Sequence, residues 1–228
     1  MKHEAELSNT LEDGRRSYMR GNYSDALNIW LPLAEKGDQE AQAWVGSLYA
    51  NGDGVEADPI AAFSWYLKSA EGGNPQAQAN IGALYAMGQG VSKDMAEAVR
   101  WMRRAAKNGD PNAQFNMAVC YTKGDGVRHS LEKAVEWYKR GAENGHYPSQ
   151  GRLGHMYYVG EGVKKDRVQA YLWLSLAGQH GIGSALSELE KVVGEMSSDE
   201  KSAAMQLVDI WQNKSGNSSP KVFTPVPE

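Results

Sequence analysis

Two short stretches of the sequence carry a serine and a lysine at the spacing that penicillin-recognising enzymes use for nucleophilic catalysis. They are S-L-E-K at Ser130–Lys133 and S-D-E-K at Ser198–Lys201. In those enzymes the S-x-x-K motif works together with S-D-N and K-T-G motifs, and the chain contains neither. Both serines stand where a helix is expected to begin, and a serine hydroxyl at that place accepts a hydrogen bond from a free backbone N–H. We therefore interpret both as helix caps and predict no catalytic residue and no enzymatic activity.

Residues that could bind a metal ion are also sparse. The histidines show no H-E-x-x-H motif and no other paired spacing; they are His3, His129, His146, His155 and His180. A single cysteine excludes an internal disulfide framework and a cysteine-based zinc site. The sequence therefore predicts no metal site and no cofactor.

The dominant feature of the chain is a repeat of 36 residues. Tryptophan marks it at Trp65, Trp101, Trp137 and Trp173. Other residues keep the same register, in the sets Gly37/Gly73/Gly109/Gly145/Gly181, Tyr49/Tyr85/Tyr121/Tyr157, Gly52/Gly88/Gly124/Gly160, Gly54/Gly90/Gly126/Gly162 and Val55/Val91/Val127/Val163. Periods of this length are typical of solenoids, in which each copy buries its apolar face against the next. The four tryptophans are accordingly predicted to form the structural core of the repeat.

Each copy is predicted to fold as two short helices, helix A and then helix B. In the second copy Ala77, Ile81, Leu84 and Tyr85 make one apolar stripe at helical spacing. Side chains that can cap a helix precede each segment: Asp38, Asn74, Asp110 and the weaker His146 for helix A, and Asp58, Asp94, Ser130 and Asp166 for helix B. The pattern predicts about twelve helices in an all-α fold.

The repeat also explains three features that would otherwise indicate chemistry. The pair Gly88-x-Gly90 lacks the third glycine and the G-K-[ST] ending of a phosphate-binding loop, so it is interpreted as the turn between helix A and helix B. The aspartates before helix B are interpreted as caps, because Ser130 replaces one of them and a serine cannot do the acid–base work of a carboxylate. Cys120 shares its column with Leu48, Leu84 and Met156, which favours a buried apolar thiol over a reactive one.

The combined pattern A-x-A-x-x-x-(I/L)-G-x-x-Y-x-x-G-x-G-V-x-x-D-x-x-x-A-x-x-W-x-x-x-A-A-x-x-G resembles the Sel1-like repeat (SLR) family, a relative of the tetratricopeptide repeat. The resemblance covers roughly residues 22–212. It implies a right-handed α-solenoid whose inner face binds proteins or peptides, commonly as an adaptor, and it implies no common catalytic residue. The chain departs from the family pattern at Ala118, where the other copies have glycine, and at Ser149 and Gly151, which replace two alanines.

The ends of the chain are predicted to differ from the repeats, because a solenoid needs a cap where it stops exposing an apolar face. Residues 1–37 are expected to form N-terminal capping helices, with Trp30 in the place of Tyr66. Residues 38–181 contain the four repeats. Residues 182–213 are expected to supply a half repeat and a capping helix that begins with a capping box of Ser197 and Glu200. Residues 214–228, which include Phe223, are predicted to be a flexible tail.

Composition excludes several classes of partner. The chain has 228 residues, 24 Lys+Arg and 28 Asp+Glu, for a net charge of −4 and no long block of one sign, which does not fit a nucleic-acid binder. No stretch approaches the roughly 18 uninterrupted apolar residues of a membrane span. As written, the N-terminus has no apolar leader, so a cytoplasmic location is expected, or a periplasmic or exported one if a leader has been removed. A monomer or weak oligomer without membrane insertion is expected.

The partner surface is predicted from the columns of helix A that vary between copies. These are Ala43/Ala79/Phe115/Gly151, Ser47/Ala83/Val119/His155, Ala50/Ala86/Thr122/Tyr158 and Asn51/Met87/Lys123/Val159. The first two copies offer mostly small side chains and the last two offer larger ones, which predicts a groove that deepens towards an aromatic zone. The predicted partner-binding residues are Met87, Phe115, Val119, Thr122, Gly151, His155 and Tyr158. The favoured function is a non-enzymatic adaptor; the alternative is an enzyme or regulatory subunit acting on bacterial cell-wall or envelope components.

Overall fold

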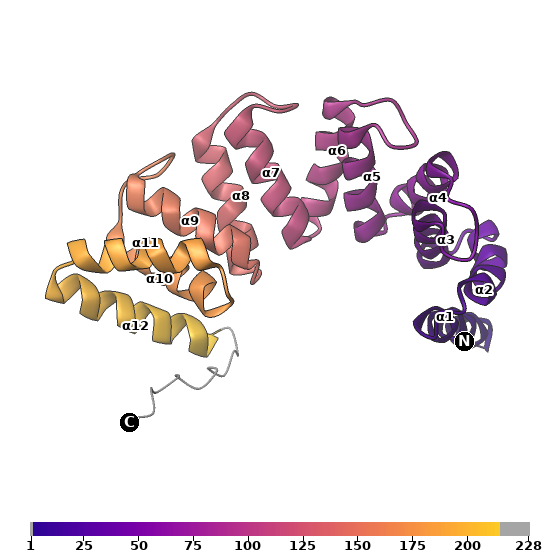
Figure 1. Cartoon of the computed structure of the whole chain (residues 1–228), viewed down its shortest axis with the longest axis horizontal. Coiled ribbons are helices and arrows are strands. Elements are labelled where there is room, and N and C mark those ends of the chain that lie inside the picture. The colour runs from indigo at the N-terminus through magenta and orange to yellow at the C-terminus, as the bar shows by residue number, and fades with distance from the viewer. Residues whose placement is uncertain (1, 215–228) are drawn as a thin grey trace. The chain divides into compact units, whose positions relative to one another are not determined.

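The computed structural model describes residues 2–214, and their side chains from residue 11 onward. Within that range the chain forms twelve α-helices and no β-strand (Figure 1), which confirms the predicted all-α class. In chain order they are α1 (Lys2–Met19), α2 (Tyr23–Glu35), α3 (Gln39–Asn51), α4 (Pro59–Glu71), α5 (Pro75–Met87), α6 (Met95–Lys107), α7 (Pro111–Lys123), α8 (Leu131–Glu143), α9 (Tyr147–Val159), α10 (Arg167–Gln179), α11 (Gly183–Glu195) and α12 (Ser198–Lys214). The predicted tail lies, from residue 215 onward, outside the described residues.

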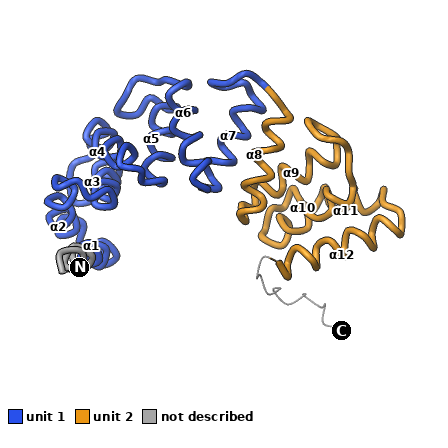
Figure 2. The backbone as a smooth tube through the Cα atoms, turned by 180° about the vertical axis from the view of Figure 1, so that it is seen from behind, with its two compact units in different colours: residues 1–129 blue, residues 130–228 orange. Residues whose placement is uncertain are grey.

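The described helices fall into two compact units that divide after His129 (Figure 2). Unit 1 contains α1–α7, and its helices pack in chain order, with α3 on α4 and α5 on α6 as the most extensive contacts. Unit 2 contains α8–α12, in which α9 packs on α10 and α10 also contacts α11 and α12. Helix A of the four copies corresponds to α3, α5, α7 and α9, and helix B to α4, α6, α8 and α10.

Side-chain caps define where the repeat helices begin. At helix A of the first copy, the Asp38 carboxylate accepts a hydrogen bond from the Ala41 N–H (2.7 Å). The same contact is made at α5, α7 and α9 by Asn74, Asp110 and His146. Helix B begins in the same way at Asp58, Asp94, Ser130 and Asp166. These contacts satisfy backbone N–H groups that have no partner within the first turn of a helix.

The two S-x-x-K stretches differ in detail from the prediction. Ser130 caps α8 as expected, because its hydroxyl accepts from the Lys133 N–H (3.2 Å). Ser198, in contrast, is the first residue of α12, and the cap is its neighbour Ser197. Ser197 forms a capping box with Glu200, in which the Glu200 N–H donates to the serine hydroxyl (3.2 Å) and the Ser197 N–H donates to the Glu200 carboxylate (2.8 Å).

The glycine pair between helix A and helix B is a tightly packed turn. Gly88 ends α5 in the left-handed conformation (φ 75°), which glycine adopts without strain. Gly90 also has a positive φ of 68°, and a Cβ at this position would collide with the carbonyl oxygen of Pro59 at the start of α4. Protein backbone therefore occupies the space beside the turn, as expected for a structural element.

The repeat tryptophans are buried to different depths. Trp101, Trp137 and Trp173 are buried, whereas Trp65 is only half-buried. A cation three residues later covers the ring in the first three copies: Lys68 over Trp65 (4.1 Å), Arg104 over Trp101 (4.6 Å) and Arg140 over Trp137 (4.6 Å). In the fourth copy the ring of Trp211 on α12 meets Trp173 edge-on at 5.8 Å. Helix α12 thus covers the tryptophan ring of the fourth copy, whereas a cationic side chain covers the ring in each of the other three copies.

A buried glutamine connects each helix A to the helix B before it. The side-chain amide of Gln42 donates to the Ala34 carbonyl at 3.0 Å. The other copies repeat the contact at 3.1–3.2 Å, from Gln78 to Ala70, from Gln114 to Ala106 and from Gln150 to Ala142. Each of these carbonyls also accepts a hydrogen bond from the backbone N–H three residues later, so the glutamine is its second partner. This role of the four glutamines was not predicted from the sequence, although they keep the 36-residue spacing.

Candidate functional site

Four of the predicted partner-binding residues lie in unit 1. Met87 is the last residue of α5, and its side chain is 57% exposed. Phe115 and Val119 are half-buried one turn apart on α7, and Thr122 follows on the exposed part of that helix. The Thr122 hydroxyl donates to the Ala118 carbonyl (2.9 Å), so it is bound within its own helix. The apolar members of this group present partly accessible surface on unit 1.

The other three predicted residues lie on α9 in unit 2, and all three face α11 or the turn before it. The Nδ1 atom of His155 lies 2.9 Å from the Glu188 carboxylate, and the Tyr158 hydroxyl donates to Glu195 (2.8 Å). Beside Gly151, the methyl group of Ile182 lies within ordinary contact distance of where a Cβ would stand (3.6 Å). These residues are therefore engaged by the C-terminal half repeat of their own unit.

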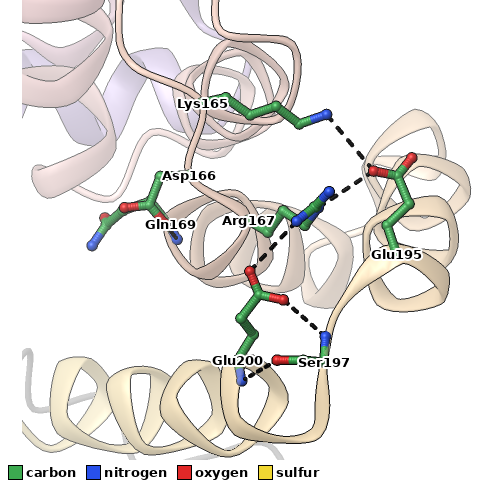
Figure 3. A network of polar contacts seen from close by, with 7 residues as sticks. All are labelled: Lys165, Asp166, Arg167, Gln169, Glu195, Ser197 and Glu200. Atoms are coloured by element: carbon green, nitrogen blue, oxygen red, sulfur yellow. Dashed lines mark hydrogen bonds and ion pairs between the residues drawn. The ribbon is translucent and has the colours of Figure 1, made fainter.

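A polar network extends this contact to the start of α12 (Figure 3). Glu195 accepts from Arg167 (3.4 Å) and lies 3.7 Å from the Lys165 ammonium. Arg167 also reaches Glu200 at 3.6 Å. The hydrogen bond from Tyr158 is the main reason that the pKa of Glu195 is lowered, and the Ser197 N–H has the same effect on the pKa of Glu200. Both carboxylates are thus held in the charged form.

Unit 1 has an open cavity at the equivalent place, between α3 and α5. Its volume is about 280 Å³. The lining residues come mainly from these two helices, with one aromatic side chain from α4; they are Glu40, Ala43, Trp44, Ser47, Tyr66, Asn74, Gln76 and Asn80. Glu40 is the one charged residue in this lining, and it forms an ion pair with Arg15 of α1. The cavity is therefore bounded by apolar groups, amides and hydroxyls.

Two aromatic side chains give this cavity a fixed shape. Trp44 stacks almost parallel on the fully buried Trp30, with ring centroids 4.8 Å apart at 16°. Tyr66 is 8% exposed, and its ring packs against α3 where Gly46 has no side chain, since a Cβ there would lie 3.0 Å from the ring. Close packing on both sides restricts the rotamers of Trp44 and Tyr66, so the cavity is formed before any ligand arrives.

The hydroxyl group of Tyr66 is surrounded by polar partners. Burial raises its pKa, and hydrogen bonds with Ser47 and Asn80 oppose that shift. A tyrosine hydroxyl can both donate and accept hydrogen bonds, so Ser47 and Asn80 are its polar partners at the wall of the cavity. The Asn80 side chain also accepts a hydrogen bond from the Gln76 amide (3.4 Å), which connects these two side chains of α5.

The A helices of unit 1 carry almost no charge. Among the residues of α3, α5 and α7, only Glu40 and Lys123 are charged. Helix α6 alone, a helix B, has five charged residues, Glu97, Arg100, Arg103, Arg104 and Lys107. Exposed or half-buried amides instead follow the A helices, at Gln39, Asn51, Gln76, Asn80, Asn112 and Asn116. Primary amides both donate and accept hydrogen bonds, as a peptide main chain does.

The remaining candidates for chemistry have structural environments. Cys120 is buried (6% exposed), and burial raises the pKa of its thiol, as expected for an unreactive apolar side chain. Within residues 2–214, no three His, Cys, Asp or Glu side chains come together as a potential metal site. The same part of the chain contains no helix that is both long and apolar enough to cross a membrane.

Sequence reasoning identified only part of the cavity. Ala43 and Ser47 belong to the variable columns of helix A, but Trp44, Tyr66 and Asn80 were not among the predicted site residues. A usable indication was present in the column Trp44/Asn80/Asn116/Arg152, where the aromatic residue occurs in one copy alone. The depth of the cavity depends on how the Tyr66 ring of α4 packs against α3. The spacing of residues in the sequence does not reveal that packing.

These features define the class of protein as a tandem array of antiparallel helix pairs with a capped C-terminal end. The model of the Sel1 repeat matches residues 39–74, 75–110, 111–146 and 148–182. The chain therefore belongs to the Sel1 repeat family, as its resemblance to that family predicted. Sel1 repeats are in general protein-interaction modules on a scaffold that is typically non-catalytic.

Solved structures agree with this assignment. A Sel1 repeat protein from Oxalobacter formigenes is 31% identical, with 91% of this chain and 84% of that protein covered and a TM-score of 0.76. A protective antigen of uropathogenic Escherichia coli strains, which has an SLR fold, is 29% identical over 89% of this chain (TM-score 0.73), and the match spans 46% of that longer protein. A Sel1 repeat protein from Klebsiella pneumoniae is 20% identical with a TM-score of 0.53 and supports the fold alone. The α-solenoid class is thereby confirmed.

A comparison with curated proteins found no match.

Proposed function

We propose that this chain is a non-enzymatic adaptor that binds a partner protein or peptide through the faces of its A helices. The observation that supports the proposal is the contrast in charge between the two sets of helices in unit 1. Helices α3, α5 and α7 offer amides, small side chains and the partly accessible Met87, Phe115 and Val119. Protein-binding surfaces are depleted of charged residues at their centre and enriched in aromatic residues and methionine.

The charged side chains of the B helices have a different role. Arg104 and Arg140 lie over tryptophan rings of their own helices, and Arg100 pairs with Glu97 at 2.8 Å. Solvated charges of this kind keep a repeat protein soluble and contribute little to specific binding. The amide-lined A faces are therefore the surface on which a partner gains most from contact.

A pair of matched substitutions tests which face binds. Asn116 on α7 and Asn28 on α2 are both exposed asparagines of unit 1; α7 is a helix A, and α2 stands before the first helix A, in the place of a helix B. The full chain and the variants Asn116→Arg and Asn28→Arg would be immobilised, and the proteins retained from the source organism quantified by mass spectrometry. The proposal requires that Asn116→Arg lose the retained partner and that Asn28→Arg keep it. Equal retention by both variants would refute the assignment of the face.

A further inference from the structure

A groove lies within unit 2, among helices α8, α10 and α12. Its volume is about 620 Å³, inside the range of roughly 300–1,000 Å³ that is usual for ligand pockets. It therefore has room for more than one side chain of a bound segment. The residues that line this α8–α10–α12 groove are Lys139, Glu143, Gln169, Leu172, Trp173, Leu207, Trp211 and Lys214.

The lining is charged at its rim and apolar at its centre. Lys139 and Glu143 pair with each other at 4.0 Å, and both side chains are about half exposed. Trp173 is buried, and the half-buried Trp211 and Leu207 stand beside it on α12. An apolar, aromatic centre inside a solvated charged rim is the usual anatomy of a surface that binds a polypeptide.

The chain itself continues from the edge of this groove. Lys214 is both the last residue of α12 and part of the lining. The sequence after it is S-G-N-S-S at residues 215–219 and P-K-V-F-T-P-V-P at residues 220–227. At about 3.1 Å per residue, eight residues in a polyproline II conformation reach about 25 Å. The two turns of α12 that line the groove measure about 10 Å, so residues 220–227 are long enough to cover it.

The composition of these residues fits the groove. The stretch 215–219 contains Gly216 and Asn217, which favour the turns that reverse a chain. Residues 220–227 contain three prolines, and proline-rich segments dock in grooves lined by aromatic side chains because their backbone loses little conformational entropy on binding. The same residues include Phe223, whose ring can pack against an indole edge-on or in an offset stack.

Covalent attachment favours this segment over any free one. A short flexible linker keeps a tethered segment near its site at an effective concentration that is roughly millimolar. A segment whose isolated Kd is on the order of 1 mM would therefore occupy the groove in a large fraction of molecules. A proline-rich segment of another protein would need a similar concentration to displace it.

From these observations we infer that residues 220–227 dock in the α8–α10–α12 groove of the same chain, with the Phe223 ring against Trp211 and Leu207. The flexible tail predicted from composition is then confined to the linker, residues 215–219. The docking uses B helices and α12, so it is a second interaction surface beside the A-helix faces of the proposed function.

NMR of the full chain tests the contact directly. We expect nuclear Overhauser effects between the Phe223 ring and the Trp211 indole, and backbone order parameters above about 0.6 for residues 222–226. Phe223→Ala should shift the Trp211 indole N–H and lower those order parameters, whereas Ser218→Ala in the linker should change neither. Absence of the Phe223–Trp211 effects in the parent would overturn the inference and leave the groove to a segment of another protein.

Two matched variants of α12 test the groove side of the contact. Leu207 lines the groove, whereas Met205 lies outside the lining and is 53% exposed. Leu207→Ala should lower the order parameters of residues 222–226, and Met205→Ala should leave them unchanged. Equal order in the two variants would refute the docking site. If Leu207→Ala disturbs folding, the comparison of Phe223→Ala with Ser218→Ala retains the decisive result.

Competition and dilution show whether the occupant belongs to the same chain. A synthetic peptide of residues 215–228 should shift the Trp211 indole of the Phe223→Ala chain with a Kd on the order of 1 mM. The parent should need about 2- to 5-fold more peptide, because its own segment competes. Equal titrations would overturn the inference. Loss of the Phe223–Trp211 effects on tenfold dilution would also overturn it, since the occupant would then be the segment of a second copy.

Discussion

The α3–α5 pair and the α9–α11 pair occupy the same positions of the repeat, but the first pair leaves an open cavity and the second is closed by contacts between its side chains. Ser47 and Asn80 in the first pair stand where His155 and Glu188 stand in the second, three repeats later. The first two residues hold the Tyr66 hydroxyl at the edge of an open cavity, and the second two bind each other at 2.9 Å. Another position differs in the same way between the two pairs. The exposed Met87 corresponds to Glu195, whose carboxylate accepts a hydrogen bond from the Tyr158 hydroxyl.

The comparison teaches that the size of the side chains in a column does not determine whether the column is available to a partner. The large residues of α9 predict a deep groove, yet within unit 2 they contact the half repeat that follows them. The small residues of α3 leave space that nothing in unit 1 fills, and that space is the cavity. What decides the outcome is the residue on the next helix A, which is a neutral amide or methionine in one case and glutamate in the other.

The largest expected effect concerns the repeat tryptophans, which are buried to different depths. Trp173 is 4% exposed and is covered by Trp211, whereas Trp65 is half-buried under Lys68. We expect Trp173→Ala to lower the free energy of unfolding by about 3–5 kcal/mol, as large core truncations do. Trp65→Ala should cost clearly less, because part of its ring is already in water. Equal losses in urea-induced unfolding would show that burial does not distinguish the two ends.

Two glycines on α9 should respond to alanine with opposite signs. A Cβ at Gly154 would lie 2.7 Å from Leu174 on α10, so Gly154→Ala is expected to destabilise by about 1–3 kcal/mol through overpacking. At Gly151 the nearest atoms are 3.6 Å and 3.8 Å away, which is normal contact. Gly151→Ala is therefore expected to stabilise by about 0.5–1 kcal/mol, the usual advantage of alanine over glycine inside a helix.

Both glycine variants would be measured by thermal and urea-induced unfolding. A loss of stability in Gly151→Ala would mean that Ile182 packs against this position more tightly than the structure describes.

Transferring the second pair to the first tests whether two residues suffice to close the cavity. In Ser47→His with Asn80→Glu, the new side chains are expected to interact by less than about 1 kcal/mol, as partly exposed ion pairs do. A double-mutant cycle isolates this term, because each single variant already loses the Tyr66 contacts. The coupling should be present at pH 5.5 and smaller at pH 8, since histidine loses its charge around pH 6.5.

Zero coupling energy at both pH values would contradict the equivalence of the two pairs.

The smallest expected effect is acid sensitivity confined to the C-terminal half repeat. The pKa of Glu195 is lowered from its ordinary value of 4.5, first by the Tyr158 hydroxyl and also by Arg167 and Lys165. A lowered pKa in the folded state means that the stabilisation is complete above pH 4.5 and is lost as the pH falls through the lower folded value. Glu195→Gln should therefore melt at a lower temperature than the parent at pH 6, and the difference should shrink as the pH falls below 4.5.

Glu190→Gln provides the control for this experiment, since Glu190 is an exposed glutamate of the same helix and forms no ion pair with another residue that the structure describes. A difference for Glu195→Gln that stays unchanged until the acid unfolding of the parent would contradict the assigned cause.

Much of the fold follows from the sequence because it is encoded locally and repeated. The caps at Asp38, Asp58 and their equivalents mark helix starts through contacts over two or three residues, and the structure contains them. The burial of Trp101, Trp137 and Cys120 follows from their repeat columns in the same way. The predicted domain limits and partner-binding residues remain predictions.

The sequence by itself determined the helix pairs, their caps, their core columns and the membership of the Sel1 repeat family, because each of these depends on spacing within one copy. Only the tertiary structure decided that His155 and Tyr158 pair with α11, that Trp44 stacks on Trp30, and that a cavity remains above Tyr66. Those outcomes join residues 14 to 37 positions apart on different helices. They depend on the distance between packed helix axes and on side-chain rotamers, which a repeating pattern of residue types does not specify.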